Sequence, residues 1–243
     1  MAEWDTEPER ILLIVAHPDD IDFVAAGSIA TWTQAGIEVT YCLVTSGDAG
    51  SEDRHRSRAD IAAEREAEQT AAAAVVGVER LIFMRRPDGE VEANLDLRRA
   101  LSRVIRQVRP DRIIGMSPEM NLDRIYAMHP DHLAVGAATL AAVYPDARNP
   151  MAFPDLLDEG LEPWACPAVW VPTGPDVAES ARVHVDITDT IDLKVAALQA
   201  HVSQTGQRDG LGTMLRQWAA STALACGLPD GRFAEAFRRV DTR

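Results

Sequence analysis

Short apolar runs alternate with amphipathic stretches through the first 143 residues. Each apolar run predicts a strand, and the first, over residues 11–16, predicts a parallel strand buried on both faces of a sheet. These predicted strands cover residues 11–16, 38–44, 80–84 and 111–116. Helical periodicity follows each of them, and the predicted helices cover residues 24–34, 59–76, 95–107 and 129–143. Strands that alternate with helices in this way predict an α/β fold with a doubly wound, mostly parallel sheet and helices on both faces.

The pattern becomes less regular after Tyr144. The stretch 145–167 has a proline every few residues and predicts irregular structure, whereas later segments again predict strands and helices. The predicted strands are 168–172 and 182–187, and the predicted helices are 190–201, 210–226 and 232–239. Because no repeat or low-complexity linker divides the chain, we expect one domain over residues 1–243, in which residues 145–243 form a more variable part that shapes the substrate pocket.

Composition and charge argue against a nucleic-acid-binding or membrane-spanning protein. The 243 residues carry a formal net charge of −14, and the one local basic cluster consists of Arg54, Arg56, Arg58 and Arg65. Such an acidic chain is poorly suited to nucleic acid, so we expect no nucleic-acid partner. The start of the chain has no basic, apolar leader and no stretch reaches the roughly 18 apolar residues of a membrane span, which favours a cytoplasmic protein. Three scattered cysteines indicate reduced, buried thiols.

The first motif, His17-Pro18-Asp19-Asp20, directly follows the first predicted strand. Ligands of open α/β sheets bind outside the carboxyl ends of the strands, which is where this motif falls. Imidazole and carboxylate both bind divalent metals. His17 and Asp20 are three residues apart and can face one point, which leaves Asp19 free to act on a water molecule. The alternative is that Asp19 or Asp20 only caps the next helix.

The second motif, His129-Pro130-Asp131-His132, follows the fourth predicted strand at the same edge of the sheet. Pro130 suits the first position of a helix, which would fix both imidazoles. Exposed histidines in the first turn of an ordinary helix are the alternative. The chain has only six histidines, and three of them lie in the two motifs. One shared metal site explains this better than two unrelated loops.

A catalytic zinc usually has three protein ligands and one open position. His17, Asp20 and His132 satisfy that number. His129 and Asp19 then remain as an acid and a base.

The residues also resemble those of the PIG-L/LmbE-like zinc-dependent deacetylases, which include N-acetylglucosaminyl, mycothiol-pathway and bacillithiol-pathway enzymes. The resemblance covers residues 11–143 and rests on AHPDD, the TSGDAG loop, Arg65-Glu66-Ala67-Glu68 and HPDH. It implies a Rossmann-like (LmbE-like) fold with one Zn²⁺ per chain, for which another divalent metal such as Fe²⁺ could substitute.

The resemblance also implies roles for individual residues. It makes His17, Asp20 and His132 the metal ligands, Asp19 the general base, His129 the electrophile or acid, and Arg65 a contact to substrate. Asp131 is expected to orient a histidine from behind, although it could equally be a simple helix-start acid, and Asp22 is expected to support the ligands in the same way.

The sequence departs from the family pattern at two places. Ile21 and Asp22 follow the two aspartates, as in members that read HPDD-x-E. Ala127 stands where some sugar deacetylases carry tyrosine, with Tyr126 beside it, so a tyrosine role does not transfer.

The predicted function is therefore hydrolysis of an N-acetyl or other N-acyl group on a small molecule, with an N-acetyl amino sugar or a related glycoside or natural-product intermediate as the expected substrate. Two alternatives stay open. They are an amidase for a larger thiol-conjugate amide of the mycothiol S-conjugate type, and a family member that binds metal or sugar without turnover. A nucleotide-binding module is disfavoured because no GxGxxG follows the first strand. Homo-oligomerisation is compatible with the sequence.

Overall fold

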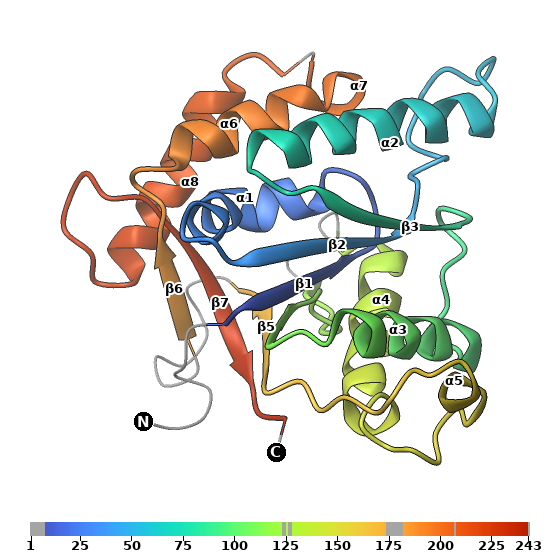
Figure 1. The fold of residues 1–243 in the computed structure, drawn as a ribbon. Helices are drawn as coiled ribbons and strands as arrows, with labels where there is room; N and C mark the ends of the chain where they lie inside the picture. The colour runs from blue at the N-terminus through green and yellow to red at the C-terminus, as the bar shows by residue number, and fades with distance from the viewer. Residues whose placement is uncertain (1–7, 123–124, 126–127, 174–181, 207, 243) are drawn as a thin grey trace.

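A single mixed sheet with helices on both faces organises the chain (Figure 1). The computed structural model describes residues 8–122, 125, 128–173, 182–206 and 208–242. The strands are β1 (Arg10–Val15), β2 (Glu38–Thr45), β3 (Arg80–Arg86), β4 (Arg112–Ile114), β5 (Ala168–Pro172), β6 (Arg182–Asp186) and β7 (Ala234–Val240). The strand order is β3-β2-β1-β4-β5-β7-β6, with parallel pairing from β3 to β5 and antiparallel pairing of β7 with both β5 and β6. The predicted α/β class and mostly parallel sheet are confirmed.

Two helical layers cover the sheet (Figure 1). On one face lie α1 (Asp20–Gln34), α2 (Arg58–Val75), α6 (Ile191–Ala200), α7 (Val202–Thr205) and α8 (Leu211–Ala225). On the other lie α3 (Leu95–Val108), α4 (Pro130–Ala141), the helical turn η3 (Ala142–Asp146) and the short α5 (Asp155–Asp158). Side chains of β1 alternate between the two cores, because Leu13 packs with α1 and α2 and Leu12 packs with α3 and α4. Within the described residues, no helix is both long enough and apolar enough to cross a membrane.

The topology places four loops at one edge of the sheet. Each parallel strand is followed by a loop that leads into a helix or a turn, so the carboxyl ends of β1, β2, β3 and β4 meet there. The strand order reverses at β1, which pairs with β2 on one side and with β4 on the other. This reversal is the point at which open α/β sheets bind their ligands, and both histidine motifs lie beside it.

The prediction of a helix over residues 232–239 is wrong. That segment forms β7, which pairs with β5 and β6. Its residues are compatible with a helix by propensity alone, but Phe237 is fully buried against Trp32 and Trp170. Strand pairing and ring packing at long range therefore override local preference. The first helix also begins at Asp20, four residues earlier than predicted.

A buried ion pair ties β7 and α6 to the first helix. Lys194 Nζ lies 2.5 Å from Glu235 Oε1, and both side chains are 5% exposed. Lys194 also donates to the carbonyls of residues 22–23, while the Glu235 carboxylate accepts from the backbone N–H groups of residues 27–28. The pair therefore secures the first two turns of α1, which begins beside the first motif.

We expect Lys194→Met to lower the free energy of unfolding by about 3 to 5 kcal/mol, because it leaves the Glu235 carboxylate buried without its cation. Urea denaturation followed by circular dichroism measures this. The control is Asp192→Asn, which breaks the exposed pair with Arg216 and should cost less than about 1 kcal/mol. Equal costs for the two variants would contradict the assigned role.

Candidate metal centre and active site

The first motif forms the connection between β1 and α1. Asp19 precedes the helix with φ of 86°, a left-handed conformation that costs a residue other than glycine about 1 kcal/mol or more. Its side chain makes no capping hydrogen bond to the helix. The Asp20 carboxylate turns back instead and accepts from the N–H of His17 at 2.8 Å. Neither aspartate side chain therefore caps the helix, and both are available to the site.

Three candidate metal-binding residues converge from the two motifs. His17 Nδ1 lies 3.2 Å from His132 Nε2 and 3.3 Å from Asp20 Oδ2, and His132 Nε2 lies 3.1 Å from Asp20 Oδ1. A tetrahedral zinc with bonds of about 2.0–2.1 Å holds its ligand atoms roughly 3.3 Å apart. The spacing and the chemistry of these three residues therefore fit a zinc ion, and the assignment of His17, Asp20 and His132 as its ligands stays a prediction.

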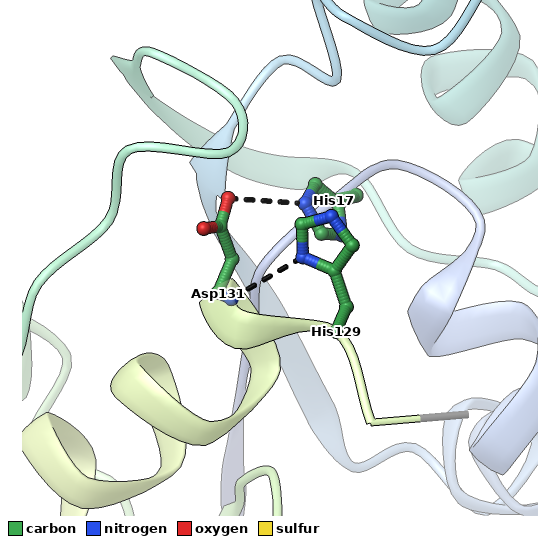
Figure 2. Close-up of side chains that lie close together, drawn as sticks. All are labelled: His17, His129 and Asp131. Carbon is green, nitrogen blue, oxygen red and sulfur yellow. Dashed lines mark hydrogen bonds and ion pairs between the residues drawn. The ribbon is translucent and has the colours of Figure 1, made fainter. Parts of the chain in front are cut away.

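The other face of His17 is held by carboxylates. His17 Nε2 lies 3.0 Å from Asp88 Oδ1 and 3.3 Å from Asp131 Oδ2, and the second contact is drawn in Figure 2. Asp131 is itself fixed by the backbone N–H groups of Gly89 at 2.8 Å and Val91 at 3.3 Å. Two acceptors at Nε2 keep a proton on that atom and leave the Nδ1 lone pair for a metal. Asp131 thus lies where it can orient a histidine from behind.

His129 lies at the mouth of the cluster. Its Nδ1 accepts from the N–H of Asp131 at 3.2 Å, and its ring meets the ring of His17 edge to face with centroids 4.7 Å apart (Figure 2). Burial and the charge of His17 lower the pKa of His129, which favours the neutral ring. Because Nδ1 is an acceptor, the neutral ring carries its proton on Nε2 and can donate from that atom.

The ionisable groups of the first motif are strongly coupled. Burial and the neighbouring Asp20 raise the pKa of Asp19 to about 7, against the attraction of Arg65. Burial disfavours charge on His17, but hydrogen bonds and attraction from Asp20 and Asp88 outweigh it and raise the pKa of His17 to about 10. Burial opposes ionisation of Asp20, yet His132 and His17 hold its pKa well below the usual range. Protons and a metal ion therefore compete for the same atoms.

Arg65 lies behind the motif. Its guanidinium donates to the carbonyls of Pro18 at 2.7 Å and Gly47 at 3.0 Å, and its Nη2 lies 3.5 Å from Asp19 Oδ2. Only 6% of the side chain is exposed. Gly47 has a positive φ of 64°, and a Cβ there would overlap the guanidinium, so the loop after β2 requires glycine at this position. The expected contact of Arg65 with substrate stays a prediction.

Asp22 is set deeper than the metal-binding atoms. Its Oδ2 accepts from Gln69 Nε2 and pairs with His201 Nε2, both at 2.8 Å, and all three side chains are fully buried. Gln69 in turn accepts from the N–H of Asp19 at 2.9 Å. The Asp22 side chain is thus linked to the first motif through Gln69, which hydrogen-bonds both Asp22 and the backbone of Asp19.

Sequence reasoning missed three residues of this site. Asp88 has a usable signal in the sequence, because it follows the third predicted strand at the same edge of the sheet, although Asp88-Gly89 is also a common turn pair. Gln69 and His201 carried none, because each is a single polar residue within or beside a predicted helix. Tyr126 and Ala127 lie outside the described residues.

Comparison with known proteins identifies the family. The model of the GlcNAc-PI de-N-acetylases (PIG-L) matches residues 12–143. The chain belongs to the PIG-L family. This match covers both histidine motifs and the strands that carry them.

Several proteins to which this PIG-L chain is similar are named deacetylases. It is 29% identical to diacetylchitobiose deacetylase of Thermococcus kodakarensis, over 96% of this chain and 83% of the relative. It is 30% identical to a probable N-acetyl-alpha-D-glucosaminyl L-malate deacetylase of Bacillus cereus, over 81% and 84%. The structure of N,N'-diacetylchitobiose deacetylase from Pyrococcus horikoshii with its inhibitor MPG matches with a TM-score of 0.84 and 27% identity, covering 97% of this chain and 85% of that one. The chain is thus an amide hydrolase of the N-deacetylase class.

We expect His132→Ala to abolish metal binding, because only two of the three converging atoms remain. Elemental analysis of protein purified without chelator should find about one zinc per chain in the unaltered protein and close to none in the variant. The control is His184→Ala, which removes an exposed imidazole on β6 and should retain the metal. Equal zinc in both variants would exclude His132 as a ligand.

Proposed function

We propose that this chain is a zinc-dependent N-deacetylase that hydrolyses the acetyl amide of an N-acetylglucosamine-type sugar. One observation carries the proposal. His17, Asp20 and His132 converge as candidate metal ligands, the Asp19 carboxylate interacts electrostatically with Asp20 and His17, and the His129 imidazole lies beside that of His132. This arrangement combines an electrophilic site, a base and a hydrogen-bond donor, which are the groups that amide hydrolysis needs.

His17, Asp20 and His132 would hold the zinc ion, which would supply Lewis-acid chemistry for the hydrolysis. Asp19 is the carboxylate left free next to the ligands, since Asp20 is directed to His17 and His132. Asp19 takes the proton from the attacking water as general base. Arg65, 3.5 Å away, keeps the carboxylate oriented.

His129 stabilises the charge that develops on the amide oxygen. Its Nδ1 is occupied by the N–H of Asp131, so its Nε2–H is the donor available to substrate. A neutral donor of this kind can hydrogen-bond the oxygen without giving up its proton. The amide nitrogen must gain a proton before the C–N bond breaks, and the proton that Asp19 has accepted from water balances that step.

The names of the relatives support the choice of substrate. Diacetylchitobiose and N-acetyl-glucosaminyl malate share an N-acetylated glucosamine unit and differ in the group attached to it. We therefore expect the N-acetylglucosamine unit to be the part that this chain recognises.

We expect the purified protein to release acetate and a free amine from N,N'-diacetylchitobiose or from N-acetylglucosaminyl malate, measured by a fluorogenic amine assay. A larger amide of a thiol conjugate serves as the third substrate. Exclusive cleavage of that amide would overturn the proposed substrate class while leaving the hydrolytic site intact.

We expect Asp19→Asn to retain zinc and to lower kcat by roughly 10²- to 10⁴-fold, because the amide cannot accept the proton of the attacking water. Zinc content and kcat are measured on the same preparation, with His184→Ala as control. Full turnover in the Asp19→Asn variant would show that another group is the base.

A further inference from the structure

Two side chains of α2 form hydrogen bonds to the same peptide group of the first motif. Arg65 donates to the carbonyl of Pro18 at 2.7 Å, and Gln69 accepts from the N–H of Asp19 at 2.9 Å. These two backbone atoms belong to the same peptide unit and point in opposite directions. Arg65 and Gln69 are one helical turn apart and lie on the buried face of α2. The plane of the Pro18–Asp19 peptide is therefore held from both ends.

The orientation of this peptide determines where the Asp19 side chain points. Asp19 has φ of 86°, which aspartate adopts only when its surroundings impose it. The carbonyl on the other side of Asp19 accepts from the N–H groups of Asp22 and Phe23 at the start of α1. With both flanking peptide groups fixed, the Cα–Cβ bond of Asp19 leaves the backbone in one direction, and the contact with Arg65 Nη2 then orients the carboxylate.

We propose that Gln69 is a positioning residue that sets the direction of the Asp19 carboxylate by clamping the Pro18–Asp19 peptide. This role rests on the proposed function only in so far as Asp19 is the base. The clamp itself is a property of the fold and can be measured without any substrate.

The chemistry of the site explains why this position carries an amide. The side chain at position 69 must accept a hydrogen bond from the Asp19 N–H and donate one to the Asp22 carboxylate. A glutamine does both at once, whereas leucine does neither and glutamate places an oxygen against another carboxylate. His201 lies 2.8 Å from the same Asp22 oxygen, so Asp22 is fixed from a third element, the carboxyl end of α6.

The first test is hydrogen exchange of the Asp19 amide, measured by mass spectrometry with fragmentation to single-residue resolution. Gln69→Leu keeps the side-chain volume but removes the acceptor, so we expect the Asp19 amide to exchange about tenfold faster or more. The control is Thr139→Val, a near-isosteric change at a buried α4 hydroxyl that lacks a hydrogen-bond partner among the described residues. Unchanged exchange in Gln69→Leu would overturn the clamp, whether or not the protein turns over any amide.

The second test exchanges donor and acceptor in the hydrogen bond between the side chains of Gln69 and Asp22. Gln69→Glu alone places two carboxylates together and should speed exchange of the Asp19 amide and lower kcat. Adding Asp22→Asn restores the hydrogen bond, because the new amide at position 22 can donate to the new carboxylate at position 69. The His201 ring can adopt its other tautomer and accept from the same amide. The double variant should therefore recover most of the lost exchange protection and most of the lost kcat. A double variant as impaired as Gln69→Glu would show that the contact between positions 22 and 69 does not carry the effect.

The third test asks whether Gln69 acts through Asp19. We expect Gln69→Leu to lower kcat by about 10- to 100-fold, with little change in KM or zinc content, because the base is misplaced while the ligands stay. In the Asp19→Asn background the same substitution should cost less than about threefold, because the group that it positions is already disabled. Equal losses in both backgrounds would make Gln69 a general structural residue. Absence of turnover in the unaltered protein would refute the proposed function, and the exchange measurement would still decide the clamp.

Discussion

Parallel pairing of β1 with both β2 and β4 is the constraint on which the site depends. It brings the carboxyl ends of the strands to one edge of the sheet. At the point where the strand order reverses, the loops after β1 and β4 lead to opposite faces of the sheet, and ligands of open α/β sheets bind there. His17 and His132 are 115 residues apart in the chain, yet their ring nitrogens lie 3.2 Å apart. The two motifs are short and locally ordinary, so their chemistry arises only when the sheet has brought them together.

This arrangement places several carboxylates close together and away from water, so their desolvation and mutual repulsion oppose folding. Each carboxylate has specific partners. Asp20 contacts the backbone N–H of His17 and the imidazoles of His17 and His132, and Asp19 contacts Arg65. Deeper in the protein, Asp22 contacts Gln69 and His201, whereas Asp88 and Asp131 both contact His17 and Asp131 also accepts from backbone N–H groups. Buried charges without such partners would be strongly destabilising. A divalent cation bound by His17, Asp20 and His132 would add to this compensation, so these carboxylates would favour metal uptake.

The sequence predicted the parts of the molecule that have a local signature. Strands β1 to β4 could be predicted because each contains a short continuous apolar run, and the convergence of the two histidine motifs could be predicted because both follow strands at one edge of the sheet. That His17, Asp20 and His132 bind a metal stays a prediction. The strand β7 was mistaken for a helix, since its identity depends on pairing with β5 and β6. Gln69 and His201 were missed for a related reason. A polar residue in a helix gains meaning only from what the fold places against it.

The buried polar residues of α2 show how the precision of the motif depends on residues outside it. Asp19 adopts a backbone conformation that its own sequence disfavours, and contacts to Arg65 and Gln69 help to stabilise it. Arg65 in turn needs Gly47 in the loop after β2, and Gln69 needs Asp22 and His201. The packing of α2 against the sheet therefore also fixes the backbone of Asp19. A chain with intact HPDD and HPDH motifs but an apolar residue at position 69 would keep every side chain of the two motifs and lose the hydrogen bond to the Asp19 N–H.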